Sequence, residues 1–307
     1  MRIDELTPKK YSRLFPKAPH VFNSVAFTEL NRHKCDEVRY LAFSDGKPRA
    51  GIIIGKRDEV WMSPFSAPYG GLTLNKRQPI PVLESIFSEL LRYADSCKGV
   101  KITLPPVWYD SDLQTKSINI LSRIPGIRST ADISYHLMLS GENGIDENGM
   151  TVTGRQNLRR SLEAPFEFVK ASGSADSIAE AYEVIRRNHA ERGYALRMSL
   201  DDVTATADVV PAEFFMLLLE GKPAAAAQVY NVAPGIAQLI NWGDIREMST
   251  LCPMNRLAYE LARHYRSRGM TALDLGPATE NGVPNEGLCR FKESLGCIPS
   301  LKYSFIL

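Results

Sequence analysis

An internal repeat constrains this 307-residue chain more than any other feature of its sequence. The segment "VRYLAFSDGKPRAGIIIGKRDEVWMSPF" (residues 38–65) resembles "EFFMLLLEGKPAAAAQVYNVAPGIAQLINW" (residues 213–242). In both, an apolar run meets a Gly-Lys-Pro turn, reverses into a second apolar run and continues into a third that ends near Trp61 or Trp242. Turns of this composition join antiparallel strands. Each copy is therefore predicted to contain a three-stranded antiparallel meander.

The similarity between the copies continues after each meander. Apolar residues recur at helical spacing from residue 82 to residue 90 in the first copy and from residue 257 to residue 265 in the second. A proline begins and a glycine ends each of these predicted helices, as helix boundaries favour. A short strand is predicted next, "VKITLPP" (residues 100–106) in one copy and "TALDLGPA" (residues 271–278) in the other.

A helix is also predicted before each meander, near residues 22–30 and 178–193. Between the copies, residues 140–154 are rich in Gly, Asn and Asp and show no periodicity, so they are predicted to form the linker. The sequence thus predicts two domains, 1–150 and 151–307. Each belongs to the α/β (α+β) class and contains a mixed, mostly antiparallel sheet flanked by helices.

Composition narrows the class of protein. With 44% hydrophobic and 23% charged residues the chain resembles soluble globular proteins, and a net charge of +2 provides no overall field for binding DNA. No stretch approaches the roughly 20 apolar residues that span a bilayer. The start, "MRIDELTPKKYSRLF", lacks the apolar core of a secretory signal. We therefore expect a cytoplasmic protein.

Several kinds of site are not supported by any motif. The five cysteines are scattered and none of the five histidines has metal-ligand spacing, so no metal site is predicted. The sequence also lacks a Gly-x-Ser-x-Gly elbow, a phosphate-binding Gly-Lys-Ser/Thr loop and a dinucleotide-binding glycine fingerprint. Hydrolase, nucleoside triphosphatase and dehydrogenase functions therefore lose their usual sequence support.

The predicted order of elements resembles the GNAT (Gcn5-related N-acyltransferase) fold, and two such units in one chain resemble the FemAB family. Three segments carry this resemblance: "SPFSAPYGGL" (residues 63–72), "TGRQNLRRSLEAPFEF" (residues 153–168) and "GLCRFKESLGC" (residues 287–297). The resemblance implies an acyltransferase whose second domain moves an acyl or aminoacyl group from a thioester or ester donor to an amine. The implied donor is acyl-CoA or aminoacyl-tRNA, and the implied acceptor is a small-molecule amine or a cell-envelope precursor.

The resemblance also implies a role for Lys292, which would lie near the acyl-transfer centre and stabilise negative charge, with Phe291 shaping the pocket. Acyl transfer to an amine builds an oxyanion, and one preorganised donor contributes on the order of 3 kcal/mol to its stabilisation. Alternatively, Lys292 is a solvated helix lysine that pairs with Glu286 or Glu293. Asn285, two residues before this segment, is a further candidate substrate-binding residue.

Residues 239–256 contain the next group of candidates. In a GNAT unit the strand here diverges from its neighbour, and the following helix offers unpaired N–H groups to the donor. Trp242, Ser249 and Asn255 are candidate binding residues, and Asp244 is a candidate catalytic residue that orients the amine or acts as a base. The segment lacks the glycine-rich loop of CoA-dependent GNAT enzymes. An ordinary strand-to-helix connection with an exposed aspartate remains the alternative.

Arg155 and Arg159 lie four residues apart on one predicted helix face, where they are candidates for gripping a phosphate. A solvated basic face is the alternative. Tyr194 follows a predicted helix end, where FemAB relatives place substrate-facing residues. Tyr69 lies between a proline and two glycines and is a candidate for the wall of an inter-domain cleft, or for a plain turn.

Two questions about function remain open at this point. The interval between Gly193 and Phe214 is too short for the helical arm of FemAB enzymes that use aminoacyl-tRNA, which favours an acyl-CoA or carrier-bound donor. The competing hypothesis is a non-catalytic tandem-GNAT binding or scaffold protein that recognises a nucleotide-linked ligand or a partner. The missing glycine-rich loop favours this hypothesis.

Overall fold

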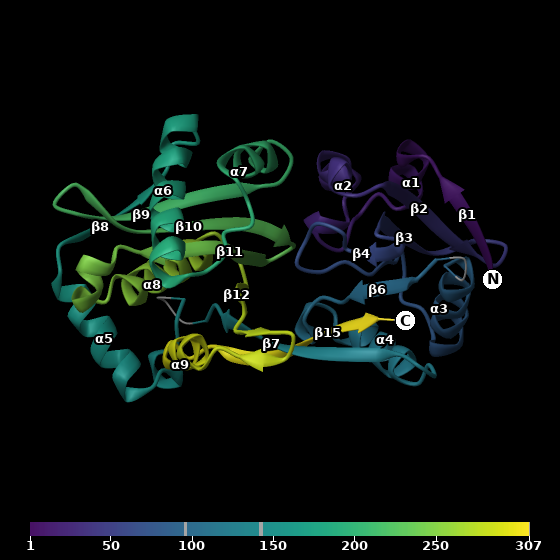
Figure 1. Ribbon diagram of the computed structural model, residues 1–307. Coiled ribbons are helices and arrows are strands. Elements are labelled where there is room, and N and C mark those ends of the chain that lie inside the picture. The colour runs from purple at the N-terminus through teal and green to yellow at the C-terminus, as the bar shows by residue number, and fades with distance from the viewer. Residues whose placement is uncertain (95–96, 141–143, 307) are drawn as a thin grey trace. The chain divides into compact units, whose positions relative to one another are not determined.

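A computed structural model of the protein describes residues 1–94, 97–140 and 144–306 (Figure 1). These residues form two compact units. Unit 1 comprises Met1–Ile133, Asn281–Val283 and Ser300–Leu307, and unit 2 comprises Ser134–Glu280 and Pro284–Pro299. Residues 141–143 of the predicted linker lie outside the described residues. The single boundary near residue 150 stays a prediction, since each unit is assembled from more than one stretch of chain.

The sheet of unit 1 contains the first predicted meander. Its strand order is β1-β2-β3-β4-β6-β15, and β5 pairs with β3. The strands are β1 (Arg2–Leu6), β2 (Glu37–Ser44), β3 (Pro48–Arg57), β4 (Val60–Ser63), β5 (Leu72–Thr73), β6 (Gly99–Thr103) and β15 (Ile298–Ile306). Strands β1 to β4 pair antiparallel in sequence order, β4 and β6 are parallel, and β15 is antiparallel to β6. The predicted meander is confirmed as β2–β4, whereas the edge strand β1 was not predicted.

Helices cover both faces of this sheet. They are α1 (Pro8–Leu14), α2 (Val25–Asn31), α3 (Ile80–Tyr93) and α4 (Ser111–Ser122), with short 3-10 turns η1 (Val21–Asn23), η2 (Arg32–Lys34) and η3 (Val107–Tyr109). Side chains alternate along a strand. Leu41 and Phe43 therefore share a core with residues of α3 and α4, whereas Tyr40 and Ala42 pack on the opposite face with Tyr11 of α1.

The sheet of unit 2 has the order β7-β12-β11-β10-β9-β8. Its strands are β7 (Arg128–Met138), β8 (Phe166–Lys170), β9 (Ala212–Leu219), β10 (Lys222–Ala233), β11 (Ile236–Asp244) and β12 (Ala272–Pro277). A small separate ladder joins β13 (Thr279–Glu280) to β14 (Val283–Pro284). Strands β8 to β11 pair antiparallel in order, β11 and β12 are parallel, and β7 is antiparallel to β12. The second meander is confirmed as β9–β11, and the edge strand β8 was not predicted.

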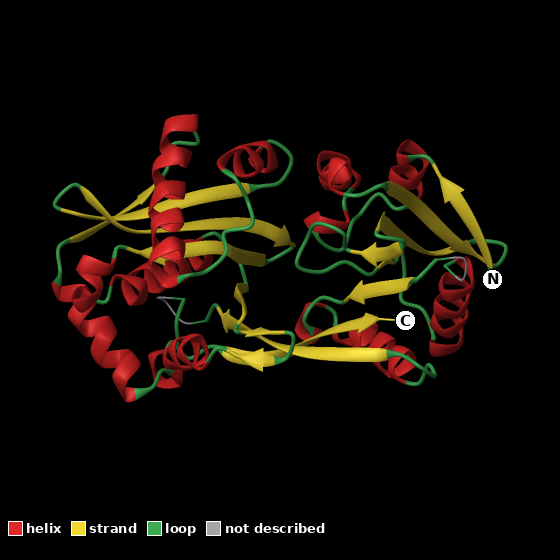
Figure 2. Ribbon diagram, in the orientation of Figure 1, coloured by secondary structure: helices red, strands yellow, loops and turns green. Residues whose placement is uncertain are grey.

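Two long helices, α6 (Ala175–Arg192) and α8 (Pro253–Ser267), pack on the strands of unit 2. The other helical elements of this part of the chain are α5 (Val152–Glu163), α7 (Leu200–Ala207), α9 (Glu286–Ser294) and the 3-10 turns η4 (Glu147–Gly149) and η5 (Arg246–Leu251). Phe214 and Met216 share a core with α6, whereas Phe215, between them in the strand, contacts Tyr265 of α8. Helices α6 and α8 therefore cover opposite faces. Figure 2 shows helices lying beside the strands of this unit.

The order of meander, helix, parallel strand, helix and antiparallel strand recurs along the chain. The predicted fold class is confirmed, because the strands of each unit form a mixed, mostly antiparallel arrangement flanked by helices. The final strands exchange partners in a way that the sequence did not reveal. Strand β15, from the second copy, pairs with β6 in unit 1, and the end of β7, from the first copy, pairs with β12 in unit 2.

Candidate functional site

Strands β11 and β12 of unit 2 diverge after a short parallel ladder. The ladder contains three residue pairs and ends where Gln238 lies opposite Asp274. Beyond that pair, β11 continues to Asp244 and β12 continues to Pro277. The ladder between the two strands therefore ends at this pair, as predicted, and we use the word cleft for the two segments beyond it that do not pair with each other, residues 239–244 of β11 and 275–277 of β12.

The corresponding place in unit 1 is filled by the chain itself. All four residues of β4 pair with β6. Just past that ladder, the Gly70 N–H donates to the Thr103 carbonyl at 2.8 Å and the Gly71 N–H donates to Ser63 Oγ at 3.0 Å. A Cβ on Gly70 would lie 2.7 Å from that same Oγ, so only glycine fits there. Unit 1 thus has no counterpart of the cleft within these described strands.

Tyr69 belongs to this filled segment. Its ring is buried, meets His20 edge-on at 4.8 Å between centroids, and its hydroxyl donates to the Tyr109 hydroxyl at 2.8 Å. These contacts hold the Pro-Tyr-Gly-Gly segment within unit 1. A role of Tyr69 in substrate binding stays a prediction.

Lys292 extends from α9 into the interior of unit 2, where 1% of its surface is exposed. Its ammonium donates to the carbonyl oxygens of Leu275, Gly276 and Pro277 at 2.8, 2.9 and 2.9 Å. An ammonium has three hydrogens, so each one has an acceptor within the protein. The alternative of a solvated lysine is wrong, because Lys292 is buried.

The two acidic residues that were possible partners of Lys292 bind elsewhere. Glu286 pairs with Arg290 at 3.2 Å, and Glu293 accepts a hydrogen bond from the Tyr135 hydroxyl at 2.8 Å. Burial lowers the pKa of Lys292 to about 8, and the negative charge of Asp274 opposes this shift. A direct contact between Lys292 and an oxyanion stays a prediction, and it requires one hydrogen to leave a carbonyl.

The structure brings Phe291 and Trp242 together, with ring centroids 5.6 Å apart. Trp242 lies on β11 beyond the end of its ladder with β12, and both rings are partly exposed. Asn285 caps α9 by accepting from the Leu288 N–H, and its Nδ2 donates to the Tyr194 hydroxyl at 3.1 Å. Four of the predicted substrate-binding residues thus form two contacting pairs in unit 2.

Asp244 is not an exposed loop aspartate, because only 4% of its surface is accessible. Its Oδ1 accepts from Asn188 Nδ2 at 2.9 Å and from an Arg192 guanidinium nitrogen at 3.0 Å. Asn188 also donates to the Asp244 backbone carbonyl and packs directly on Gly243, where a Cβ would clash with it. Asp244 therefore joins the end of β11 to α6, and its predicted catalytic role remains untested.

Helix α8 begins after the 3-10 turn η5, which occupies the position of the glycine-rich loop. Its N-cap, Cys252, adopts a left-handed conformation and makes no side-chain capping bond. Ser249 is exposed in η5, and Asn255 in the first turn of α8 is buried with its Nδ2 unpartnered. In this first turn Pro253 has no N–H, and the Asn255 N–H donates to the Cys252 carbonyl at 3.1 Å. The helix dipole is therefore the main feature that favours an anion at this end.

The two candidate arginines of α5 differ in their surroundings. Arg155 donates to the carbonyl oxygens of Met150 and Glu147 at 2.6 and 3.3 Å, so it stabilises the turn before its helix. Arg159 is exposed. Helix α5 packs closely on the end of α9, since a Cβ on Gly154 would meet the Ser294 carbonyl at 1.9 Å.

Three residues at this site were missed in the sequence. Asp274 is fully buried and accepts from Gln238 Nε2 at 3.0 Å and from the Gly276 N–H at 2.8 Å. Its position inside the apolar strand "ALDLGP", directly before a Leu-Gly pair, was an available signal. Gln238 and Asn188 carried no comparable local signal, because their partners are distant in the sequence.

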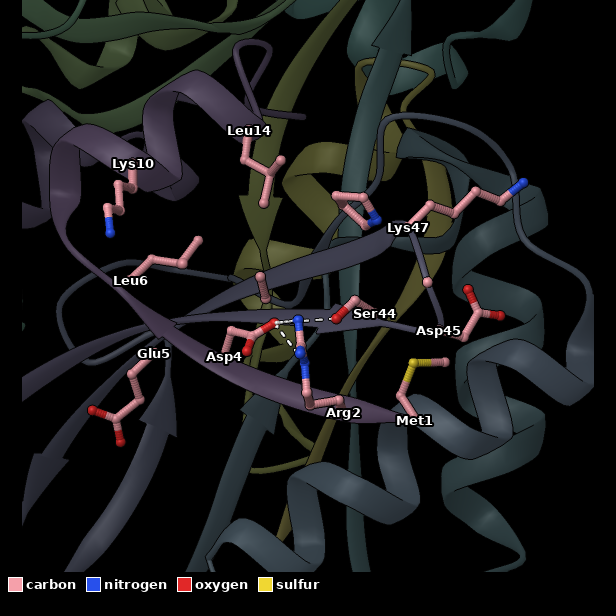
Figure 3. A pocket seen from close by; sticks show the side chains of 13 residues that line it. Met1, Arg2, Asp4, Glu5, Leu6, Lys10, Leu14, Ser44, Asp45 and Lys47 are labelled. Carbon is pink, nitrogen blue, oxygen red and sulfur yellow. Dashed lines mark hydrogen bonds and ion pairs between the residues drawn. The ribbon is translucent and has the colours of Figure 1, made fainter.

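A surface hollow of about 690 Å3 lies elsewhere, in unit 1 beside β1 and the β2–β3 hairpin (Figure 3). There the side chains of Arg2, Asp4 and Ser44 point toward one another, with an Arg2–Asp4 ion pair of 3.0 Å. None of the predicted site residues lines this hollow. The location of the site in unit 2 stays a prediction.

Residues 1–94, 97–140 and 144–306 contain no group of three or more His, Cys, Asp or Glu side chains arranged to hold a metal ion. Within the same ranges, no helix combines the length and the apolar character needed to cross a membrane.

Comparisons with known proteins agree on the fold. No family model and no curated protein matches the sequence. Among solved structures, FemX superposes with a TM-score of 0.70 at 12% identity, covering 100% of this chain and 97% of that chain. The C-terminal domain of an Agrobacterium fabrum protein named as a lysylphosphatidylglycerol synthetase gives a TM-score of 0.59 at 15% identity, covering 98% and 92%.

A tandem GNAT protein from the clavulanic acid biosynthesis pathway gives a TM-score of 0.51 at 12% identity and covers 99% of this chain and 97% of that chain. At such identities the similarity establishes the fold alone. The chain therefore has the FemAB-like tandem GNAT fold, which confirms the resemblance identified in its sequence.

Proposed function

We propose that the protein is an acyltransferase that moves an acyl or aminoacyl group from a thioester or aminoacyl ester donor to an amine in the cleft of unit 2. The observation that carries this proposal is the divergence of β11 from β12 after Gln238 and Asp274. The filled counterpart in unit 1 favours unit 2 as the reacting unit.

The cleft offers what an extended donor needs. Alternate N–H and C=O groups of a strand point to opposite sides, so residues 239–244 of β11 present backbone groups both to β10 and toward the cleft. An acyl chain with amide groups can pair with the cleft side. The uncapped start of α8 lies a few residues further along the chain, where it favours an anionic part of the donor.

In the proposed reaction the neutral amine attacks the donor carbonyl carbon, a C–N bond forms, and the carbonyl electrons move to oxygen. The tetrahedral intermediate collapses, the bond to the thiolate or alkoxide breaks, and the amine proton leaves. Asp244, at the end of β11, is the proposed acceptor of that proton. Trp242 and Phe291 are the proposed contacts of the acyl group.

The remaining candidates are assigned to the ligands. Ser249 and Asn255 are proposed to bind the donor at the start of α8, Arg159 to bind a phosphate, and Tyr194 with Asn285 to bind the acceptor. Arg155 and Tyr69 are proposed to support these contacts through the backbone and ring interactions described above.

The donor is proposed to be acyl-CoA or another carrier-bound thioester, with aminoacyl-tRNA as the competing donor. Between the end of α6 and the start of β9 the chain contains one short helix, α7, which leaves no room for a long arm. We propose a small-molecule amine or a cell-envelope precursor as the acceptor, and a cytoplasmic location.

The experiment that tests this proposal is a transfer assay read by mass spectrometry. The purified protein is incubated with a panel of amines and either a set of acyl-CoAs or a pool of charged tRNAs. We expect an acylated amine from one donor class. Asp244→Asn, which keeps the side-chain shape, should lower the rate at least 100-fold, since acid–base groups contribute about 10²–10⁴.

The second candidate function is a non-catalytic binding protein with the same fold. The replacement of the glycine-rich loop by the 3-10 turn η5 favours it. Such a protein binds a nucleotide-linked ligand without transfer, so a measured dissociation constant together with no product from any donor and amine would favour it.

A further inference from the structure

Three consecutive carbonyl groups, of Leu275, Gly276 and Pro277, converge on the Lys292 ammonium. In a regular strand successive carbonyls point to opposite sides. Their convergence therefore requires the chain to turn. Gly276 provides this turn with a φ of +74°, which other residues rarely adopt, and the register with β7 shifts at the same place. We call these three carbonyls the cradle.

A buried carboxylate fixes the start of the same turn. Asp274 accepts from the Gly276 N–H at 2.8 Å through one oxygen and from Gln238 Nε2 at 3.0 Å through the other. Gln238 and Asp274 form the last pair of the ladder between β11 and β12. The carboxylate thus marks the point of divergence, and the ammonium fixes the path of β12 beyond it.

We propose that Lys292 is a positioning residue that keeps the cleft open by binding the cradle, and that it does not itself contact the donor. This inference rests on the proposed function, because that function makes the cleft the donor site. Its tests do not depend on that function. With the ammonium in place, the three carbonyls are satisfied without donors from β11. Without it, they need other donors, and β11 can supply them, because its residues 239–244 have no ladder partner on the side of β12.

This proposal differs in its consequences from a direct oxyanion contact. A residue that only stabilises an oxyanion can be replaced with little loss of folding stability. A residue that binds two buried carbonyls and one part-buried carbonyl, and whose charge is attracted by the buried Asp274 carboxylate, cannot, because orphaned buried groups are costly. The proposed positioning role also predicts that the cradle binds a small primary ammonium ion once the Lys292 side chain is removed.

The first test uses Lys292→Ala, melting temperature and n-propylammonium, which has the atoms that the substitution removes. We expect Tm to fall by about 6 °C or more. Propylammonium should then raise the Tm of the variant but not that of the wild type. Tetramethylammonium, which has no N–H group, should raise the Tm of neither protein. Equal effects of both ions, or an unchanged Tm, would overturn the proposal.

Arg290→Ala is the matched control, because it removes an exposed cation from the same helix. Lys292→Met is the second variant, since it fills the volume but cannot donate. A Tm for Lys292→Met within about 1 °C of the control contradicts the proposal. If Arg290→Ala folds but neither Lys292 variant does, the loss of folding stability is larger than expected and has the expected direction.

The second test is hydrogen exchange of the β11 amides at residues 239–244, compared between wild type and Lys292→Met. If the cleft closes as proposed, the amides that face it exchange more slowly in the variant, relative to peptides of α6. Unchanged relative exchange with a lowered Tm would show a merely structural lysine. Neither test uses a donor or an acceptor, so failure of the proposed function leaves both tests intact.

Discussion

Glu213 fixes the end of helix α8 that lies opposite the proposed donor site. This carboxylate on β9 is 8% exposed. It accepts from Lys170 at 2.6 Å, from Arg268 at 2.6 and 2.7 Å, and from the Tyr265 hydroxyl at 2.9 Å. Tyr265 and Arg268 lie at the end of α8, so Glu213 ties that helix to the sheet.

The magnitude follows from the pKa of Glu213, which these three donors lower from 4.5 to about 2 although burial opposes them. One pKa unit corresponds to about 1.4 kcal/mol, so the difference between 4.5 and about 2 amounts to at most about 3.5 kcal/mol, net of the opposing effect of burial. Because the folded-state pKa lies below the unfolded value, this contribution is complete above about pH 4.5. It is lost as the pH falls toward 2.

The assay is urea denaturation of wild type and Glu213→Gln at a series of pH values. At pH 7 we expect the variant to be less stable by about 3 kcal/mol, and the difference should shrink as the pH falls below 4.5. Glu167→Gln on the neighbouring strand β8 is an exposed control and should change stability by less than about 0.5 kcal/mol. A difference between Glu213→Gln and wild type that is absent at pH 7, or independent of pH, would refute the reasoning.

Three further predictions concern the cleft and its surroundings. Trp242→Ala should raise the dissociation constant of the donor about tenfold or more with a small change in Tm, and titration calorimetry checks this; an unchanged constant removes Trp242 from the binding site. Gly70→Ala should destabilise unit 1 by about 1–3 kcal/mol because its Cβ meets Ser63 Oγ at 2.7 Å, while donor affinity stays within about twofold; a matching loss of affinity would place the donor in unit 1. Arg155→Ala should lower Tm, because the Arg155 side chain donates to two carbonyl oxygens. Arg159→Ala should leave Tm unchanged and reduce the salt dependence of binding to a phosphate-bearing ligand. Identical behaviour of the two variants in thermal melts and salt titrations would contradict this distinction.

The elements specified by local sequence signals were predictable. The two Gly-Lys-Pro turns lie within a few residues of the strands that they join, so β2–β4 and β9–β11 followed from the sequence. Helix α6 ends at Gly193, as its glycine indicated. Strands β1 ("RIDEL") and β8 ("FEFVK") are short edge strands with charged residues, and their patterns did not distinguish them from loops.

The details of the site depend on contacts between distant segments, which a sequence pattern does not specify. The Phe-Lys pair pointed to Lys292, but nothing near it indicated that three carbonyls about 15 residues away would bind its ammonium. Asp244 looked like a loop residue because its burial comes from Asn188 on α6. The exchange of β7 and β15 was equally hidden, since strand pairing is decided by the whole fold.

The central claim is that the donor binds in the cleft of unit 2, and hydrogen exchange with mass spectrometry tests it most directly. The protein is measured alone, with acetyl-CoA and with charged tRNA. We predict that one of these ligands slows exchange in peptides covering residues 239–256 and leaves residues 60–71 of unit 1 unchanged. Protection confined to residues 60–71, or no protection from either ligand, would contradict the claim.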